Sequence, residues 1–258
     1  MLTQNRLKRT INNGKLALGL MSVLPVPAMV AMVGAAGYDF IILDPERGGI
    51  GPGLLEDLIR AAECAGIAAL VRVPPSAPDA LSRALNAGAQ GVVVRVKSRE
   101  EAEAVVRGSR FPPRGERSLD EGRLTGFGRM PPSEFVTRAN REVTVCVSIE
   151  DRAAVEALDS IVTVDGLDLV LEDGLALSLS YGQPGRQEHP EVQAAIRSVG
   201  ATCLRHGVSY CARPRLPGES ERWLREGAAA LLLGEDRGLV FRSLQAHLEN
   251  VRLELTSQ

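Results

Sequence analysis

Residues 69–96 read ALVRVPPSAPDALSRALNAGAQGVVVRV, and this stretch contains one complete strand–helix–strand unit. The runs Ala69–Val73 and Gly91–Val96 are almost entirely apolar, which is typical of parallel strands that are covered on both faces. Between them, Asp79–Ala87 has a helical pattern that stops at Gly88, a common signal for a helix end. The stretch therefore predicts two parallel strands joined by a crossover helix.

The same alternation extends along the whole chain of 258 residues. Six further apolar runs predict strands, at Leu16–Met21, Phe40–Leu43, Val143–Ile149, Leu167–Leu171, Gly207–Cys211 and Ala230–Leu233. Eight β/α units in a chain of this length match a TIM (β/α)8 barrel, so we expect an α/β fold with one domain over residues 1–258. A doubly wound sheet is the alternative fold, and it typically has a glycine-rich turn after the first strand. Residues Met21–Pro25 contain no glycine, which favours the barrel.

Several segments between the strands carry clear helix signals. Pro52 opens a helical run that stops at Gly66, and Ser98 with Glu101 forms a capping box. The last segment has apolar residues on one stripe, which predicts an extra C-terminal helix over residues 238–256 that packs on a neighbouring subunit. The glycine- and proline-rich stretch 111–130 is expected to be a long loop with a function.

Composition excludes several classes of protein. The 30 basic and 32 acidic residues give a net charge of -2, which argues against a nucleic-acid binder. The N-terminal residues lack the apolar core of a signal peptide, and no uninterrupted apolar run reaches the ~18 residues of a membrane span. We therefore expect a cytoplasmic protein without a membrane or nucleic-acid partner.

Amines, imidazoles and thiols are scarce. The only lysines are Lys8, Lys15 and Lys97, the histidines are His189, His206 and His247, and the cysteines are Cys64, Cys146, Cys203 and Cys211. The cysteines form no CxxC pair, and the apolar runs around the first three predict buried thiols. Lys97 as a Schiff-base lysine and Cys211 as a nucleophile are minor alternatives, and His189 is expected to cap a helix.

Charged residues follow most of the predicted strands. In a TIM barrel the C-terminal strand ends meet at one mouth, where carboxylates can hold a divalent cation and arginine can clamp a carboxylate. An ion-pair network that only closes the barrel end is the alternative. The residues at these ends are Asp44, Glu46, Arg47, Arg72, Arg95, Lys97, Glu150, Asp151, Glu172, Asp173, Cys211, Arg213, Glu235 and Asp236.

An ordered set of motifs resembles the HpcH/HpaI aldolase family, whose members are metal-dependent aldolases that use pyruvate on a TIM barrel and include citrate-lyase-like relatives. The resemblance covers nearly the whole chain. It rests on residues 13–19, 36–46, 70–73, 85–91, 110–117, 147–150, 181–185 and 189–196.

The resemblance implies roles for particular residues. Arg72 matches the arginine that binds the carboxylate and carbonyl of pyruvate, Glu150 matches a ligand of the divalent metal, and Asp44 and Glu46 match the acidic frame of the site. Two positions depart from the family. Arg47 stands where the family has its catalytic histidine, and Ala176 stands where it has an aspartate ligand.

These departures alter the expected chemistry. Arginine stays protonated near neutral pH, so Arg47 cannot act as a base but can hold an anion or stabilise an oxyanion. Asp173 or Glu172 would have to replace the missing ligand, and we favour Asp173 because neighbours on a strand face opposite sides. A weak site for Mg²⁺, Mn²⁺ or Co²⁺ at Glu150 and Asp173 is therefore expected.

Three functions follow from this reading. The first is a divergent carbon–carbon lyase that acts on a 2-oxo acid through Asp44, Glu46, Arg47 and Arg72, with Arg47 and Arg72 binding the substrate and with altered or no metal dependence. The second is a non-catalytic pseudo-aldolase that binds a small carboxylate or serves as a scaffold. The third is a citrate-lyase-like acyl-CoA enzyme, which would need basic mouth loops, for which Arg114, Arg117, Arg123 and Arg129 are candidates. The resemblance further implies a homo-oligomer, a trimer or hexamer.

Overall fold

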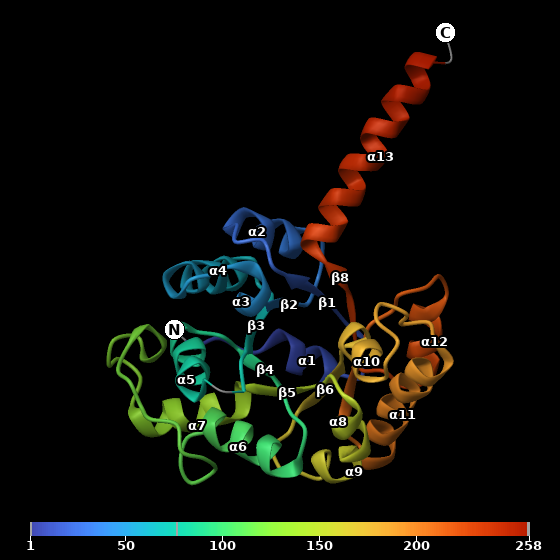
Figure 1. Cartoon of the computed structure of the whole chain (residues 1–258). Coiled ribbons are helices and arrows are strands. Elements are labelled where there is room, and N and C mark those ends of the chain that lie inside the picture. The colour runs from blue at the N-terminus through green and yellow to red at the C-terminus, as the bar shows by residue number, and fades with distance from the viewer. Residues whose placement is uncertain (1, 76, 257–258) are drawn as a thin grey trace.

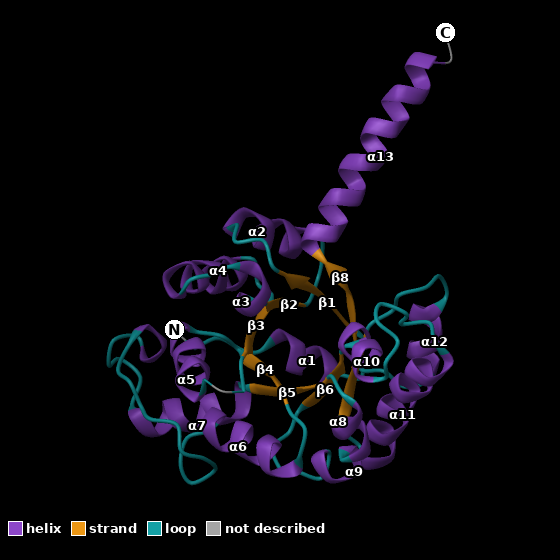
Figure 2. Cartoon of the chain, in the orientation of Figure 1, coloured by secondary structure: helices purple, strands orange, loops and turns teal. Residues whose placement is uncertain are grey.

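The computed structural model describes residues 2–75 and 77–256 (Figure 1). Within them, eight parallel strands pair in chain order, and β1 also pairs with β8, so that the sheet closes into a barrel (Figure 2). The strands are β1 (Ala17–Ser22), β2 (Phe40–Leu43), β3 (Ala68–Val73), β4 (Gly91–Arg95), β5 (Thr144–Ile149), β6 (Leu169–Glu172), β7 (Ser209–Ala212) and β8 (Ala230–Glu235). The predicted TIM-barrel fold is confirmed, with each predicted strand within one or two residues of its place.

Helices surround this ring, and they begin where proline or a capping side chain favours a first turn. Asp44, Ser98, Asp151 and Asp173 each accept a hydrogen bond from a backbone N–H of the helix that follows. The helices are α1 (Arg6–Asn12), α2 (Pro27–Ala35), α3 (Pro45–Gly48), α4 (Pro52–Cys64), α5 (Pro78–Ala87), α6 (Arg99–Ser109), the 3₁₀ turn η1 (Arg123–Thr125), α7 (Pro132–Glu142), α8 (Arg152–Glu156), α9 (Leu158–Ile161), α10 (Gly174–Ser180), α11 (Pro190–His206), α12 (Glu219–Arg225) and α13 (Asp236–Thr256).

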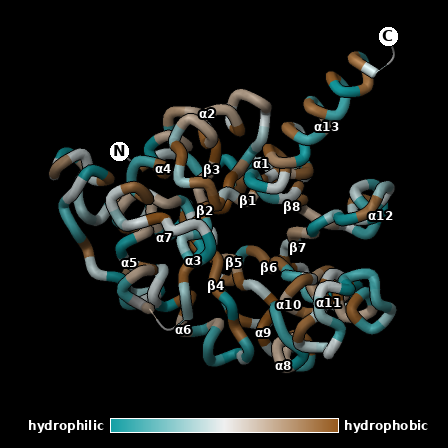
Figure 3. Tube along the Cα trace, turned by 45° about the horizontal axis from the view of Figure 1, so that its top comes forward, coloured by the Kyte–Doolittle hydropathy of each residue, from teal (hydrophilic) through white to brown (hydrophobic). Residues whose placement is uncertain are grey.

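The barrel interior is a packed core of inward-pointing strand residues. Phe40, Leu70, Val93 and Leu169 belong to it, and the strands appear as the hydrophobic centre of Figure 3. Gly19 leaves the space that the Phe40 ring fills, because a Cβ at Gly19 would lie 2.2 Å from that ring. Any side chain at this position would displace the ring, so the sequence places glycine opposite phenylalanine.

Helix α1 closes the N-terminal end of the barrel. Leu7 is fully buried in the inner core, and the Asn5 amide donates to the backbone oxygens of Gln90 and Glu142. The long loop after α6 lies at this same end, since Arg123 in it bonds Glu63 and the Ala87 oxygen, at the ends of α4 and α5.

That position corrects one prediction. Arg114, Arg117, Arg123 and Arg129 lie in the loop that follows α6 and precedes β5, at the opposite end of the barrel from the C-terminal strand ends. They cannot form basic mouth loops. Arg117 is instead buried over the ring of Phe111, and burial lowers its pKa to about 10.

Helix α13 leaves the barrel and projects away from it (Figure 1). Its first residue is held firmly, because the Asp236 carboxylate accepts hydrogen bonds from the Ser22 hydroxyl and the Val23 amide at 2.6 and 3.1 Å. Beyond that anchor its apolar side chains are exposed, Phe241 at 60%, Leu244 at 63% and Leu248 at 50%. The predicted helix is confirmed, and among the described residues no helix is long and apolar enough to cross a membrane.

Two smaller expectations were wrong. Cys64 is exposed at the end of α4 rather than buried, because the helix turns that position to solvent, whereas Cys146 and Cys203 are buried as predicted. His189 occupies the first position before α11, but its side chain makes no capping hydrogen bond.

Candidate active site

The strand alternation aims a ring of charged side chains into the mouth of the barrel. Ile42, Leu70, Leu171 and Cys211 all belong to the inner core. Side chains two residues further along a strand point to the same side. These positions are Asp44, Arg72, Asp173 and Arg213, and Ser148 and Glu150 follow Cys146 in the same way.

Arg72 is the centre of this ring. Its guanidinium contacts three carboxylates, Glu150 at 2.8 Å, Glu46 at 2.9 Å and Asp44 at 3.4 Å. The side chains of Arg72 and Glu150 are only 10% and 5% exposed, so the pairs lie where water screens charge weakly. Arg72 is therefore held rigidly by partners that follow β2 and β5 in the chain.

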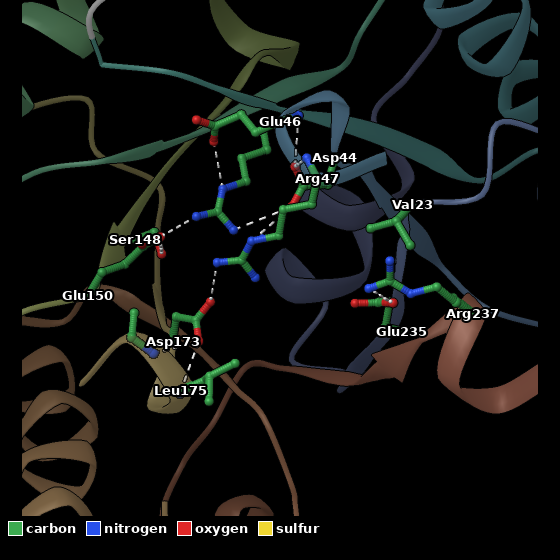
Figure 4. A network of polar contacts seen from close by, with 12 residues as sticks. Val23, Asp44, Glu46, Arg47, Ser148, Glu150, Asp173, Leu175, Glu235 and Arg237 are labelled. Atoms are coloured by element: carbon green, nitrogen blue, oxygen red, sulfur yellow. Dashed lines mark hydrogen bonds and ion pairs between the residues drawn. The ribbon is translucent and has the colours of Figure 1, made fainter. Parts of the chain in front are cut away.

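Arg47 lies across the mouth from the short helix α3. The Asp44 carboxylate starts this helix by accepting from the backbone N–H groups of Glu46 and Arg47. Gly48 lets the helix lie against the backbone that follows β1, because a Cβ there would meet the Val23 oxygen at 2.2 Å. The Arg47 side chain extends to Asp173 at 3.1 Å, a pair drawn in Figure 4, and its Nε lies 3.9 Å from Asp44.

Asp173, not Glu172, faces the mouth, as the alternation predicted. Asp173 contacts Arg47 and Arg213 and caps α10 through the amides of Leu175 and Ala176. Glu172 points to the other side, where it is fully buried and contacts Arg215 at 2.8 Å.

The protonation of the site follows from burial and from these charges. Burial raises the pKa of Glu150 above its usual 4.5, and the charge of Arg72 opposes this only in part. Burial would also raise the pKa of Asp173, but Arg213 and Arg47 outweigh it and lower that pKa. For Arg47, burial is outweighed by Asp173, Asp44 and Glu150, which raise its pKa. Arg47 is therefore a permanent cation among three carboxylates.

The side chains as they stand do not fit a divalent cation. Among the described residues no three His, Cys, Asp or Glu side chains are grouped to hold one. The two expected ligands, Glu150 and Asp173, already contact guanidinium groups, and Ala176 offers no ligand atom.

The other candidates contribute little to the mouth. Lys97 is 54% exposed and pairs with Asp151, whereas a Schiff-base lysine is activated by desolvation in an apolar pocket or by a neighbouring cation. Cys211 lies in the inner core, where burial strongly raises its pKa, which makes it a poor nucleophile. Glu235 pairs with Arg237, and Asp236 anchors α13.

Two residues of the site were not assigned a role from the sequence. The Ser148 hydroxyl donates to Glu150 at 2.9 Å, and Arg213 contacts Asp173 at 3.4 Å. Counting in steps of two from the apolar residues Cys146 and Cys211 identifies both of them.

The chain is similar to members of one protein family over nearly its whole length. A match to the HpcH/HpaI aldolase/citrate lyase family spans residues 18–242. A 5-keto-4-deoxy-D-glucarate aldolase from Enterobacter sp. (strain 638) is 30% identical over 241 residues, 93% of each chain. The crystal structure of the citrate synthase SbnG has a TM-score of 0.90 at 34% identity, covering 96% of this chain and 98% of that one. The HpcH/HpaI aldolase from Desulfitobacterium hafniense DCB-2 also has a TM-score of 0.90, at 29% identity and 97% coverage of both chains. The chain belongs to the HpcH/HpaI aldolase/citrate lyase family.

Proposed function

We propose that this protein forms or cleaves a carbon–carbon bond next to a 2-oxo acid, and that it works as a condensing enzyme in which Arg47 supplies the positive charge that a divalent metal would otherwise supply. The observation that carries the proposal is the position of Arg47. Its guanidinium lies between Asp173 and Asp44, shares Asp44 with Arg72, and is more exposed than that of Arg72.

Arg72 and Arg47 suit a 2-oxo acid. The contacts of Arg72 with Glu46, Asp44 and Glu150 use one N–H each, which leaves one N–H on Nη1 and one on Nη2 for a carboxylate. The 39% exposed Arg47 can turn toward the keto oxygen. Fixed cations at a carbonyl stabilise the oxyanion that forms when carbon attacks it. Neither arginine can accept a proton, so the base must be a carboxylate. We assign this role to Glu150, because its raised pKa makes it the stronger base of the cluster.

The reaction that this arrangement supports is the condensation of an acyl thioester with a 2-oxo acid. Glu150 removes a proton from the carbon beside the thioester carbonyl. The enolate carbon bonds to C2 of the 2-oxo acid, whose keto oxygen becomes an alkoxide beside Arg47. The alkoxide then takes the proton that Glu150 had removed, which restores the Glu150 carboxylate. Water cleaves the thioester, which releases the thiol and a new carboxylate.

The relatives support two variants of this chemistry. The similarity to the citrate synthase SbnG favours condensation with an acyl thioester. The similarity to 5-keto-4-deoxy-D-glucarate aldolases favours cleavage that releases a pyruvate enolate. We place condensation first, because a histidine base is missing at position 47 and the arginine there suits an alkoxide.

The test is to incubate the protein separately with acetyl-CoA plus oxaloacetate and with 5-keto-4-deoxy-D-glucarate, and to identify products by mass spectrometry. We expect citrate and free thiol from the first mixture. Pyruvate from the second mixture alone would establish the aldolase instead. Binding of either 2-oxo acid without any product would favour a pseudo-aldolase.

We also propose that α13 packs on a neighbouring copy of the chain in a trimer or hexamer. Five of its exposed apolar residues are spaced alternately by three and four, as in helices that pair along a seam. They are Phe241, Leu244, Leu248, Val251 and Leu255.

A further inference from the structure

Beside Arg72 and its three carboxylate partners lies a hollow of about 340 Å³. It is lined by Glu46, Pro74, Pro75, Arg95, Lys97 and Glu101. Glu46 belongs to both sites, because its carboxylate contacts Arg72 at 2.9 Å. A molecule bound to Arg72 can therefore extend directly into this hollow.

The charged side chains of the hollow differ in whether they have a hydrogen-bond or ion-pair partner. Glu46 is paired with Arg72, Lys97 lies 3.3 Å from Asp151, and Glu101 accepts from the Lys97 amide at 2.7 Å. The side chain of Arg95, an exposed residue at the end of β4, has no hydrogen bond or ion pair with any described residue. The Arg95 guanidinium is thus a cation of the hollow whose N–H donors are all free to bind a ligand.

The strand geometry aims Arg95 at the same mouth as Arg72. Val93 is in the inner core and is the register partner of Arg72, and Arg95 is two residues further along the strand on the same face. One strand across and two residues along correspond to about 8 Å between the two Cα atoms. Long arginine side chains from these positions can hold the two ends of one small molecule.

We propose that Arg95 binds the second carboxylate of a dicarboxylic 2-oxo acid of the oxaloacetate class, while Arg72 binds the end that carries the keto group. This inference rests on the proposed function for the choice of a 2-oxo acid. It makes Arg95 the residue that distinguishes a dicarboxylic substrate from pyruvate. An arginine with free donors suits a carboxylate, which it binds through two parallel hydrogen bonds.

The test compares the affinities of oxaloacetate, pyruvate and coenzyme A by calorimetry in the full-length protein and in Arg95→Gln. We expect the substitution to weaken oxaloacetate binding about 10- to 100-fold and to leave pyruvate binding unchanged. Arg60→Gln is the matched control, since Arg60 lies on α4 outside the hollow and pairs with Glu56, and it should change neither affinity. Arg95→Lys should recover part of the oxaloacetate affinity.

Three results would overturn the proposal: equal weakening of oxaloacetate and pyruvate, no weakening of either, or weakening confined to coenzyme A, which would assign Arg95 to a phosphate. Because the readout is binding, it is independent of turnover. If no condensation occurs but Arg95→Gln still loses oxaloacetate selectively, the proposed reaction fails while the assignment of Arg95 stands.

Discussion

Replacing Arg47 with glutamine removes the charge that we assign to the oxyanion. The loss of one donor that stabilises an oxyanion lowers kcat about 100- to 1,000-fold. The fold should tolerate the change, because the Arg47 side chain is 39% exposed and Asp173 keeps its contact with Arg213 at 3.4 Å. An ion pair of this exposure contributes at most about 1 kcal/mol, which corresponds to a fall in Tm of about 2–4 °C.

The assay is the release of free thiol from acetyl-CoA in the presence of oxaloacetate, with Tm measured on the same samples. Arg60→Gln is the matched control, since Arg60 is a similarly exposed arginine that pairs with Glu56 on α4 away from the mouth, and it should keep full activity. Arg47→Lys should recover part of the lost rate because it restores a cation. If Arg47→Gln retained kcat within about threefold, oxyanion stabilisation of the size expected for one donor would be refuted.

Three further predictions concern the base, the ion pairs and the C-terminal helix. The acid limb of the kcat/KM profile should lie above pH 4.5, because burial raises the pKa of Glu150. Ser148→Ala should move this limb to higher pH, since the Ser148 hydroxyl lowers the pKa of Glu150. An acid limb at or below pH 4.5 would exclude Glu150 as the base. The lowered pKa of Asp173 means that its ionised form stabilises the fold above its unfolded pKa of about 3.8, and that this stability is lost as the pH falls through the folded pKa. Denaturant titrations should therefore show Asp173→Asn to be less stable than the parent at pH 7, with a difference that shrinks under acid conditions; a gap independent of pH would count against the charge as its cause. The double substitution Leu244→Glu and Leu248→Glu should convert the assembly to monomers in light scattering, and a parent protein that is itself monomeric would contradict the role given to α13.

The fold could be predicted because every strand carries its own apolar run. Parallel strands covered on both faces leave a signal that survives without tertiary information, as in Gly91–Val96, of which the strand takes residues 91–95. The projection of α13 could not be predicted, because an apolar stripe indicates that a helix has a partner but not which surface provides it.

The site was predictable as a set of residues but not as a set of contacts. Alternation along the strand selects Asp173 over Glu172. The contact between Arg47 and Asp173 joins residues 126 positions apart, and only the closure of the barrel brings them together. The arginines of the loop after α6 were predicted at the wrong end of the barrel. Their charge can be read from the sequence, but a loop lies at the C-terminal end of the barrel only if it follows a strand, and this loop follows a helix.

The measurement that tests the central claim most directly is condensation in the absence of divalent metal. Protein treated with a chelator and assayed in metal-free buffer with acetyl-CoA and oxaloacetate should release thiol and form citrate at the same rate as the untreated protein, because Arg47 provides the charge at the keto oxygen. If the chelated protein were inactive and Mg²⁺, Mn²⁺ or Co²⁺ restored its activity, the assignment of that role to Arg47 would be contradicted.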